Sequence, residues 1–311
     1  MNKRTLLIIG LMLGGFLAHA QRLGSSPEYI TALTASWKGE RFPDGRPKVS
    51  DGLLERLKKI TLEEAWGILK RKGYVNQFEG DWMVVKPDST MTGRVVTAQY
   101  MPARPDLDSF VVERGKAENR SQRGSRNLWP VDILVPGDVY VADSYGKVAD
   151  GTLIGSSLGN AIYGRSKRGV IFYGSVRDMQ ELTATPGFNG WIKGYDPSAI
   201  SQMEITSINA PVRIGRATVL PGDVVLANKY GVVFIPAYLV EELVISAEVT
   251  AIRDEFERVR LQEGTYLTGQ IHGQWSDTIK KDFMNWLHTA YAGPLPMSKK
   301  DLDDYLKAHD Y

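Results

Sequence analysis

The sequence predicts an α/β chain that carries additional helices at both ends, and three observations support this class. Trp82 to Val85 and Arg94 to Ala98 are β-branched and aromatic, which is typical of short strands. Gly169 to Tyr173 is a short apolar run of the kind that forms a buried strand. Leu239 to Arg260 has apolar residues at helical spacing. The 311 residues, 43% apolar and 24% charged, provide enough apolar material for a sizeable core.

The first twenty residues have the pattern of a secretory signal and are not expected to belong to the fold. Lys3 and Arg4 form a basic start, Leu6 to Leu17 is apolar, and Ala18-His19-Ala20 resembles a cleavage site before Gln21. The apolar run is short for a membrane span, although an uncleaved anchor or a buried helix is the alternative. We therefore expect an exported protein, periplasmic or extracellular, without a stable membrane span after cleavage.

Composition excludes several classes of function. Removing residues 1–20 lowers the number of Lys and Arg from 38 to 36, which equals the 36 Asp and Glu, so the net charge becomes zero. Nucleic-acid binding needs a basic surface, so we expect no nucleic-acid partner. The chain has no Cys, which excludes disulfides, a thiolate nucleophile and a zinc–thiolate site. Any metal must be held by oxygen or imidazole ligands.

Helix start and stop signals define the first part of the chain. Residues 21–49 are polar and predict a loop segment, which precedes a main domain over residues 50–245.

Ser50 is expected to cap a helix over residues 51–60. Thr61 to Glu64 is a capping box for a helix that ends near Arg71, with Trp66, Ile68 and Leu69 on its buried face.

An arginine-rich segment follows at residues 113–126, with glycine, serine and asparagine between the basic residues. It could bind anions as an arm, but it has no interleaved aromatic residues. A solvated loop or an oligomer contact is therefore the favoured interpretation.

Two segments of the chain are internally similar. Pro136 to Val148 and Pro221 to Val233 are identical at eight of thirteen positions, including a shared Pro-Gly-Asp-Val. Each copy predicts a Pro-Gly turn, a strand, a tight turn at Tyr-Gly and a second strand. Asp138 and Asp223 are interpreted as turn residues whose carboxylates accept local N–H groups, rather than as catalytic acids.

The later segments combine a loop with a helical tail. Residues 183–204 are rich in Gly and Pro and predict a lid or a packed surface loop. Residues 210–219 predict another strand. Residues 246–311 are expected to be a helical C-terminal extension, with Ser276 and Ser298 capping its last two helices. We interpret this extension as a packing or oligomer arm.

The segment Gly155 to Asp178 carries the strongest candidate chemistry. Gly155 and three following residues precede an expected helix, whose free N–H groups favour an anion. Arg177 and Asp178 follow the buried strand, where ligands often lie in α/β folds. Arginine can grip a carboxylate with two hydrogen bonds, and aspartate can hold magnesium or manganese. Taken singly, a serine cap and a surface ion pair are the alternatives.

These motifs together resemble the RraA-like family, named for the regulator of ribonuclease E activity A. The resemblance covers roughly residues 50–245 and rests on Pro-Gly-Asp-Val, Gly-x-x-Leu, Gly-Val-Ile-x-x-Gly-x-Val-Arg-Asp and the second Pro-Gly-Asp-Val. The family includes 4-hydroxy-4-methyl-2-oxoglutarate aldolases and non-enzymatic regulators. It implies a swivelling β/β/α domain that assembles as a homo-oligomer, a trimer or hexamer, with active sites near subunit interfaces.

The resemblance also implies roles for particular residues. A small anionic 2-oxo acid would be held through its pyruvyl group, and Asp178 would organise a divalent metal, Mg or Mn. Ser156 stands where aldolase members often have an acidic residue. Asn228 departs from the aspartate of a later Ala-Asp-x-x-Gly pattern. The residues implied to bind substrate are Gly155, Ser156, Ser157, Leu158 and Arg177.

The function implied is an exported, metal-dependent lyase of the aldolase or decarboxylase type, with Arg177 and Asp178 as its catalytic residues. The alternative is a non-catalytic binding or regulatory protein of the same family. Methyltransferase activity is disfavoured because no glycine-rich nucleotide loop of that type is present.

Overall fold

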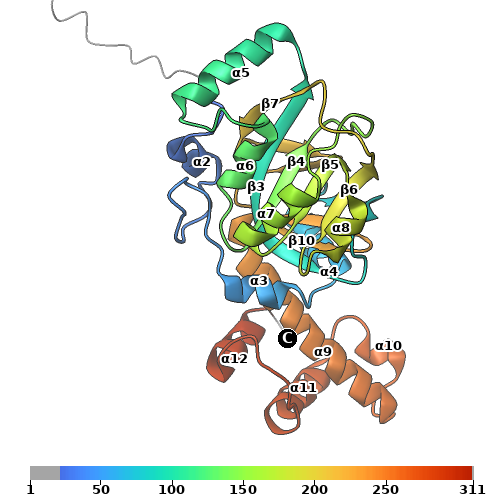
Figure 1. Ribbon diagram of the computed structural model, residues 1–311. Coiled ribbons are helices and arrows are strands. Elements are labelled where there is room, and N and C mark those ends of the chain that lie inside the picture. Colours follow the sequence, from blue (N-terminus) through green and yellow to red (C-terminus); the bar gives the residue numbers. More distant parts are fainter. Residues whose placement is uncertain (1–21, 310–311) are drawn as a thin grey trace, which may run out of the picture.

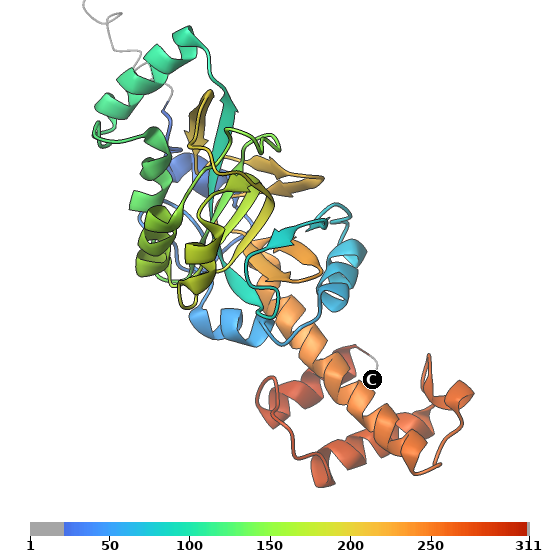
Figure 2. The same ribbon diagram turned by 45° about the vertical axis from the view of Figure 1, so that its right-hand side comes forward.

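A computed structural model describes residues 22–309 of the chain, and Figures 1 and 2 show the described part as an α/β body with a helical lobe at one end. The segment interpreted as a signal, residues 1–20, lies outside the described residues. The α-helices are α2 (Pro27–Leu33), α3 (Asp51–Leu57), α4 (Leu62–Arg71), α5 (Pro105–Ala117), α6 (Trp129–Asp132), α7 (Ser156–Ser166), α8 (Met179–Ala184), α9 (Val240–Gln262), α10 (Thr268–Ile271), α11 (Asp277–Thr289) and α12 (Lys299–Ala308).

The strands form one large mixed sheet and a separate hairpin. The strands are β1 (Phe78–Glu79), β2 (Met83–Val84), β3 (Met91–Pro102), β4 (Asp138–Asp143), β5 (Val170–Val176), β6 (Gly190–Tyr195), β7 (Met203–Ile208), β8 (Val212–Ile214), β9 (Ala217–Val219), β10 (Val224–Asn228) and β11 (Gly231–Ile235). The large sheet has the order β1-β11-β10-β3-β4-β5-β6-β2, and β7 also pairs with β3. Strands β3 to β6 are mutually parallel, whereas β10, β11 and β7 run antiparallel to their neighbours.

The two faces of the sheet are buried against different layers, as the alternation along β3 and β4 shows. Val96 and Tyr140 face a core that also contains Ile162 of α7 and Leu182 of α8. Val95, Val139 and the neighbouring odd-numbered residues face a second core, shared with the β8–β9 hairpin and with β10 and β11. Because successive side chains of a strand point to opposite faces, one sheet separates a β/α core from a β/β core. The fold is therefore the mixed α/β architecture that the sequence predicts.

The two similar segments fold alike at their turns but differently afterwards. Asp138 accepts a hydrogen bond from the N–H of Val135 at 3.0 Å, and Asp223 accepts one from Leu220 at 2.8 Å, which confirms the turn interpretation. The second copy then forms the expected hairpin of β10 and β11. The first copy does not, and that prediction is wrong. Strand β4 lies between two parallel neighbours, β3 and β5, so no hairpin partner can pair beside it.

The capping signals of the N-terminal helices are confirmed. Thr61 and Glu64 form the reciprocal capping box of α4, and Ser50 caps α3 through the N–H of Leu53. Ile68 and Leu69 are buried as expected, but Trp66 is 37% exposed and lies outside the core.

Three loop predictions are corrected by the structure. Residues 21–49 are not only a loop, because they contain α2, which starts with a Pro and is capped by Ser26 through the N–H of Tyr29. Part of the arginine-rich segment belongs to α5, because a Pro at the helix start and acidic residues in its first turn favour a helix. Residues 183–204 contain β6 rather than only a loop, and their Phe188 and Trp191 are fully buried. The glycine and proline content of the segment favoured a loop prediction, although β6 is the fourth of the parallel strands β3 to β6.

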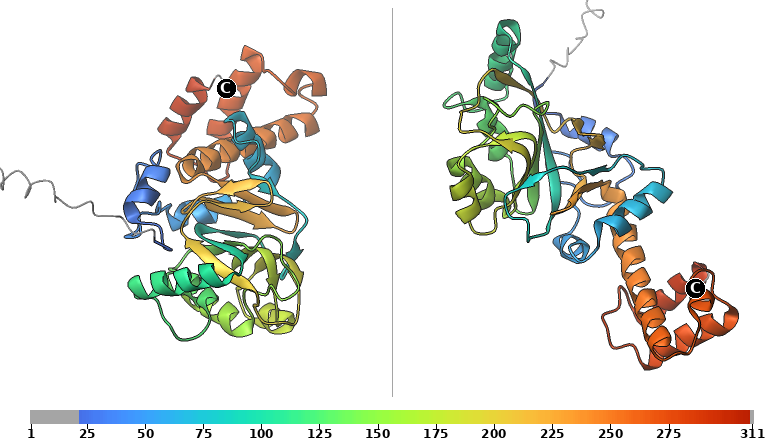
Figure 3. Two further views of the ribbon diagram at one scale, coloured as in Figure 1. Left: turned by 90° about the horizontal axis from the view of Figure 1, so that it is seen from above. Right: turned by 90° about the vertical axis from the view of Figure 1, so that its right-hand side faces the viewer.

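The C-terminal helices form a lobe with its own core. Figure 3 shows α9 projecting from the sheet domain, with α10, α11 and α12 gathered around its far half. Phe256 of α9 makes ring contacts with Trp275, Phe283 and Trp286 at 5.3 to 5.5 Å between centroids. Helix α9 runs without a break across residue 245, where the C-terminal extension is expected to begin. Among residues 22–309, no helix is long and apolar enough to cross a membrane.

Candidate active site

The candidate site lies where α7 begins and β5 ends. Residues 152–154 run alongside the last residues of β5: the N–H of Leu153 donates to Ser175 at 3.0 Å and the N–H of Arg177 donates to Ile154 at 3.0 Å. These bonds fix the start of the helix beside the end of the strand. Segments separated by more than twenty residues are thereby brought to one place.

Asp178 makes the central contact of the site. Its Oδ2 accepts a hydrogen bond from the backbone N–H of Ser156 at 3.0 Å. The same oxygen lies 3.8 Å from Nε of Arg177, and the Arg177 and Asp178 side chains are 43% and 40% exposed. Asp178 has a φ of 56°, a left-handed conformation that aspartate tolerates better than most residues. The turn directs its carboxylate back to the helix and leaves it accessible to solvent.

Gly155 is required by this close approach. A Cβ atom at residue 155 would lie 2.3 Å from Oδ2 of Asp178 and 2.9 Å from Nε of Arg177. The backbone of Gly155 is extended and needs no glycine for conformational reasons. The reason for glycine here is therefore the space that the carboxylate and the guanidinium occupy.

The structure places the six predicted site residues as follows. Gly155, Ser156, Arg177 and Asp178 meet directly. Ser157 is exposed and Leu158 is partly buried against the core under α7. Both belong to the first turn of α7, where backbone N–H groups have no intrahelical acceptor and the helix dipole favours negative charge. The arrangement can therefore receive an anion between the first turn and Arg177.

A divalent metal fits this site only as a hydrated ion. No group of three or more His, Asp or Glu that could hold a metal is present among residues 22–309, so no closed protein cage is formed there. Asp178 is a half-exposed carboxylate that contacts Ser156 N–H and Arg177 through Oδ2. Magnesium commonly keeps several waters and uses one or two carboxylates together with oxygens of the substrate. The donor set matches that kind of binding.

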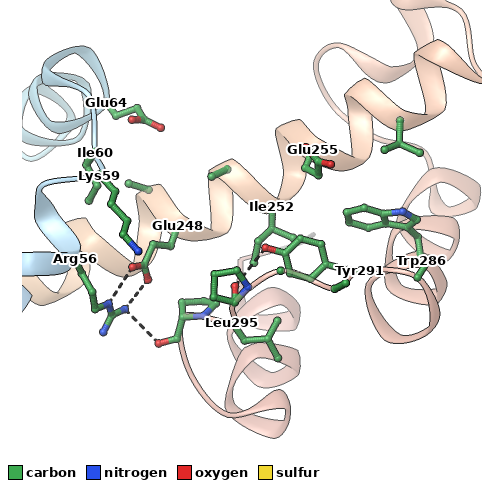
Figure 4. A pocket seen from close by; sticks show the side chains of 18 residues that line it. Arg56, Lys59, Ile60, Glu64, Glu248, Ile252, Glu255, Trp286, Tyr291 and Leu295 are labelled. Carbon is green, nitrogen blue, oxygen red and sulfur yellow. Dashed lines mark hydrogen bonds and ion pairs between the residues drawn. The ribbon is translucent and has the colours of Figure 1, made fainter. Parts of the chain in front are cut away.

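A separate cavity lies between the sheet domain and the C-terminal lobe. Its volume is about 750 Å³, and it lies between α3, α9 and the segment after α11 (Figure 4). Arg56 of α3 donates to Glu248 of α9 at 2.9 and 2.5 Å, and to the carbonyl of Pro296 at 3.2 Å. These bonds connect the lobe to the sheet domain, and the cavity lies at this connection. It shares no residue with the Gly155–Asp178 site.

Sequence reasoning missed the most deeply buried ion pair of the described chain. Arg46, only 1% exposed, donates to both carboxylate oxygens of Asp138, at 2.9 and 3.1 Å. The pairing with Asp138 and Asp44 raises the pKa of Arg46 despite its burial, which keeps the guanidinium charged. The pair joins the N-terminal segment to the first Pro-Gly-Asp turn. Arg46 lies in a loop segment without a periodic pattern, and no local signal marked it.

Comparison with known proteins relates this geometry to a family. Residues 47–234 match the model of the RraA-like family, described as Aldolase/RraA. The chain is 27% identical over 259 residues to protein DlpA of Legionella pneumophila, covering 80% of this chain but only 38% of that protein's length. It is also 27% identical over 146 residues to a protein of Halalkalibacterium halodurans named "Putative 4-hydroxy-4-methyl-2-oxoglutarate aldolase", covering 44% of this chain and 67% of that one.

A solved structure supports the same relationship. Streptomyces coelicolor RraAS2, described as an unusual member of the RNase ES inhibitor RraA protein family, superposes with a TM-score of 0.58 and 25% identity. The match covers 68% of this chain and all of that chain. The family therefore contains relatives described as inhibitors as well as relatives named as aldolases.

Proposed function

Because the chain belongs to the RraA-like family, we propose that it is a divalent-metal-dependent carbon–carbon lyase that acts on a 2-oxo acid with a pyruvyl group. One observation carries the proposal. Ser156 N–H, the Arg177 guanidinium and the Asp178 carboxylate converge at the start of α7. This combines hydrogen-bond donors for an anion with an oxygen ligand for a metal, as a 2-oxo acid requires.

The chain's own residues bind and orient the substrate carboxylate. Arg177 can offer two parallel N–H donors to a carboxylate, a geometry that lysine cannot reproduce. The N–H groups at the start of α7 add further donors and a partial positive charge. In the absence of substrate, Asp178 accepts the Ser156 N–H. A substrate carboxylate can take this donor and release the carboxylate of Asp178.

Asp178 would hold the metal, which when bound supplies a Lewis acid that polarises the 2-oxo oxygen of the substrate. Arg177, next to it, stabilises the negative charge that develops on the substrate when a carbon–carbon bond breaks. The electron pair of that bond passes to the pyruvyl carbon, which gives the enolate of pyruvate. A proton from water then completes pyruvate.

Ser156 favours decarboxylation over aldol cleavage within this mechanism. Aldol cleavage needs a base that removes the proton of the 4-hydroxyl group before the bond breaks. The position that is often acidic in aldolase members is Ser156, and a serine hydroxyl is a poor base at neutral pH. Loss of carbon dioxide from a 3-carboxyl group needs no such base, because the leaving group carries no proton. We therefore propose oxaloacetate-type substrates ahead of 4-hydroxy-2-oxo acids.

The proposal is tested by pyruvate release from the purified chain. Oxaloacetate and a set of 4-hydroxy-2-oxo acids are supplied with Mg²⁺ or Mn²⁺, and rates are corrected for the metal alone. We expect metal-stimulated release that Asp178→Asn lowers by about 100-fold or more, since a Lewis acid contributes several kcal/mol. Asp88→Asn, which removes an exposed carboxylate elsewhere, should retain the rate. No turnover of any substrate with either metal would refute the lyase assignment.

Export and assembly complete the proposal. The N-terminal pattern of residues 1–20 supports an exported protein, and membership of the family supports a homo-oligomer. The sequence has no cysteine to form interchain disulfides, so assembly would depend on packed surfaces. Scattering or sedimentation of the purified chain measures its oligomeric state.

A non-catalytic binding protein is the second candidate, because RraAS2 belongs to an inhibitor family and resembles this chain. The two candidates differ in what Asp178 does. A protein partner recovered equally by the wild type and by Asp178→Asn, together with no pyruvate release, would favour the binding function.

A further inference from the structure

The two Pro-Gly-Asp turns provide an internal comparison of carboxylate environments. In the first turn, Asp138 accepts the N–H of Val135 and binds the Arg46 guanidinium through both oxygens. The centre of that guanidinium lies 5.1 Å from the ring centroid of Phe42. The buried carboxylate is thus complemented by a planar cation that lies over an aromatic ring.

In the second turn, the equivalent carboxylate, that of Asp223, has no such cation among the described residues. Asp223 is 4% exposed and accepts a hydrogen bond from the N–H of Leu220. Arg41 comes from the N-terminal segment that packs here, but it donates to Thr34, Trp37 and Gly45 instead. Burial raises the pKa of Asp223 to about 7, and no neighbouring positive charge offsets this. A buried carboxylate that ionises without a cationic partner is costly.

Asp223 lines a cavity of about 270 Å³ with aromatic walls. Trp37 comes from the N-terminal segment, Tyr74 from the loop after α4, and Tyr238 from the turn just before α9. The hydroxyl groups of Tyr74 and Tyr238 are joined by a hydrogen bond of 2.8 Å. Like the surroundings of Arg46, the cavity combines a buried carboxylate with aromatic side chains, but it contains no guanidinium group from the described part of the chain.

We propose that this cavity binds a small guanidinium compound, whose planar cation pairs with Asp223 and lies against the aromatic side chains Trp37, Tyr74 and Tyr238. A guanidinium matches a carboxylate with two parallel hydrogen bonds and stacks favourably on aromatic faces. The attraction of a cation to an aromatic ring strengthens when both are removed from water. A cavity of about 270 Å³ has room for the cationic head and a short apolar tail, and not for a polymer.

The site is independent of the proposed lyase site. Trp37 and Tyr238 lie outside residues 47–234, so two of its walls come from parts of the chain that the family model does not match. It also shares no residue with Gly155–Asp178. A guanidinium compound bound here would hold together the N-terminal segment, the sheet and the start of the C-terminal helices.

Saturation-transfer NMR with ethylguanidinium on the full chain tests the proposal, with N-ethylurea as the neutral compound of matched shape. We expect saturation transfer from the protein to ethylguanidinium and none to N-ethylurea. Asp223→Asn should weaken binding by about tenfold or more, as expected for a hydrogen bond to a charged group. Tyr238→Leu, which removes one aromatic wall, should also weaken binding. Asp88→Asn serves as the surface-carboxylate control, and Asp178→Asn should bind the probe like the wild type.

Thermal unfolding of each variant establishes that it is folded before binding is compared. Equal saturation transfer to ethylguanidinium and N-ethylurea would overturn the proposal. An affinity for ethylguanidinium that is unchanged in Asp223→Asn, or no transfer to ethylguanidinium from the wild type at millimolar probe, would also overturn it. Loss of binding in Asp178→Asn would place the probe in the lyase site and would equally overturn it.

Discussion

The buried carboxyl of Asp223 should make the stability of this protein fall as the pH rises, and Asp223→Asn should remove that effect. The side chain is 4% exposed and accepts a hydrogen bond from the N–H of Leu220. Burial raises its pKa from 3.8 to about 7. Asparagine has nearly the same shape and keeps an oxygen for the N–H of Leu220, so the substitution mainly removes the ionisable group.

The direction of the effect follows from proton binding. Below pH 3.8, Asp223 is protonated in both the folded and the unfolded chain, and its stabilising contribution is fully present. Between that value and about pH 7 the folded chain keeps a proton that the unfolded chain has lost, so the free energy of unfolding decreases as the pH rises. The full shift of about three units corresponds to about 4 kcal/mol.

Urea unfolding at about pH 5 and about pH 8 measures this contribution as a difference between the variant and the wild type, since other groups titrate alike in both. About two units of the shift fall in this range, so Asp223→Asn should gain about 3 kcal/mol relative to the wild type. Asp88→Asn should show no such change. A difference between Asp223→Asn and the wild type that stays constant from about pH 5 to about pH 8 would refute the reasoning.

Three further predictions follow from local contacts. Gly155→Ala should abolish lyase activity while the chain stays folded, because its Cβ meets the Asp178 carboxylate. The Cβ of Gly164→Ala, within α7, meets no atom within 4 Å, so that variant should stay active in the pyruvate assay. Arg46→Met leaves a buried carboxylate unpaired and should cost about 3–5 kcal/mol in urea unfolding; a loss below about 1 kcal/mol contradicts the importance of the pair. Thr61→Ala removes one half of a capping box and should lower the free energy of unfolding by about 1 kcal/mol, and an unchanged urea midpoint would argue against the cap.

Local features of the fold were predictable because neighbouring residues determine them. The capping box at Thr61 and the Ser50 cap need only a few adjacent residues, and the structure contains both. The contact of Asp178 with the start of α7 depends on a helix and a strand in direct succession. That short unit let the sequence indicate which residues meet, although their roles stay proposals.

Features that depend on distant pairing were not predictable. Arg46 and Asp138 are 92 residues apart, and only the folded chain shows that the loop carrying Arg46 covers the first Pro-Gly-Asp turn. The similar segments predict similar hairpins, but β4 is enclosed by parallel strands while β10 has room for a hairpin partner. Likewise, the cavity at Asp223 is formed by segments from both ends of the chain.

The most direct test of the central claim is a crystal structure of the protein with Mn²⁺ and oxalate, a stable mimic of the pyruvate enolate. We predict that the Asp178 carboxylate holds the manganese directly or through water, with oxalate between the metal, the Arg177 guanidinium and the first turn of α7. The Ser156 N–H would then donate to the ligand instead of to Asp178. Manganese and oxalate bound elsewhere, or absent while Asp178 still accepts the Ser156 N–H, would contradict the claim that this segment forms a metal-dependent 2-oxo acid site.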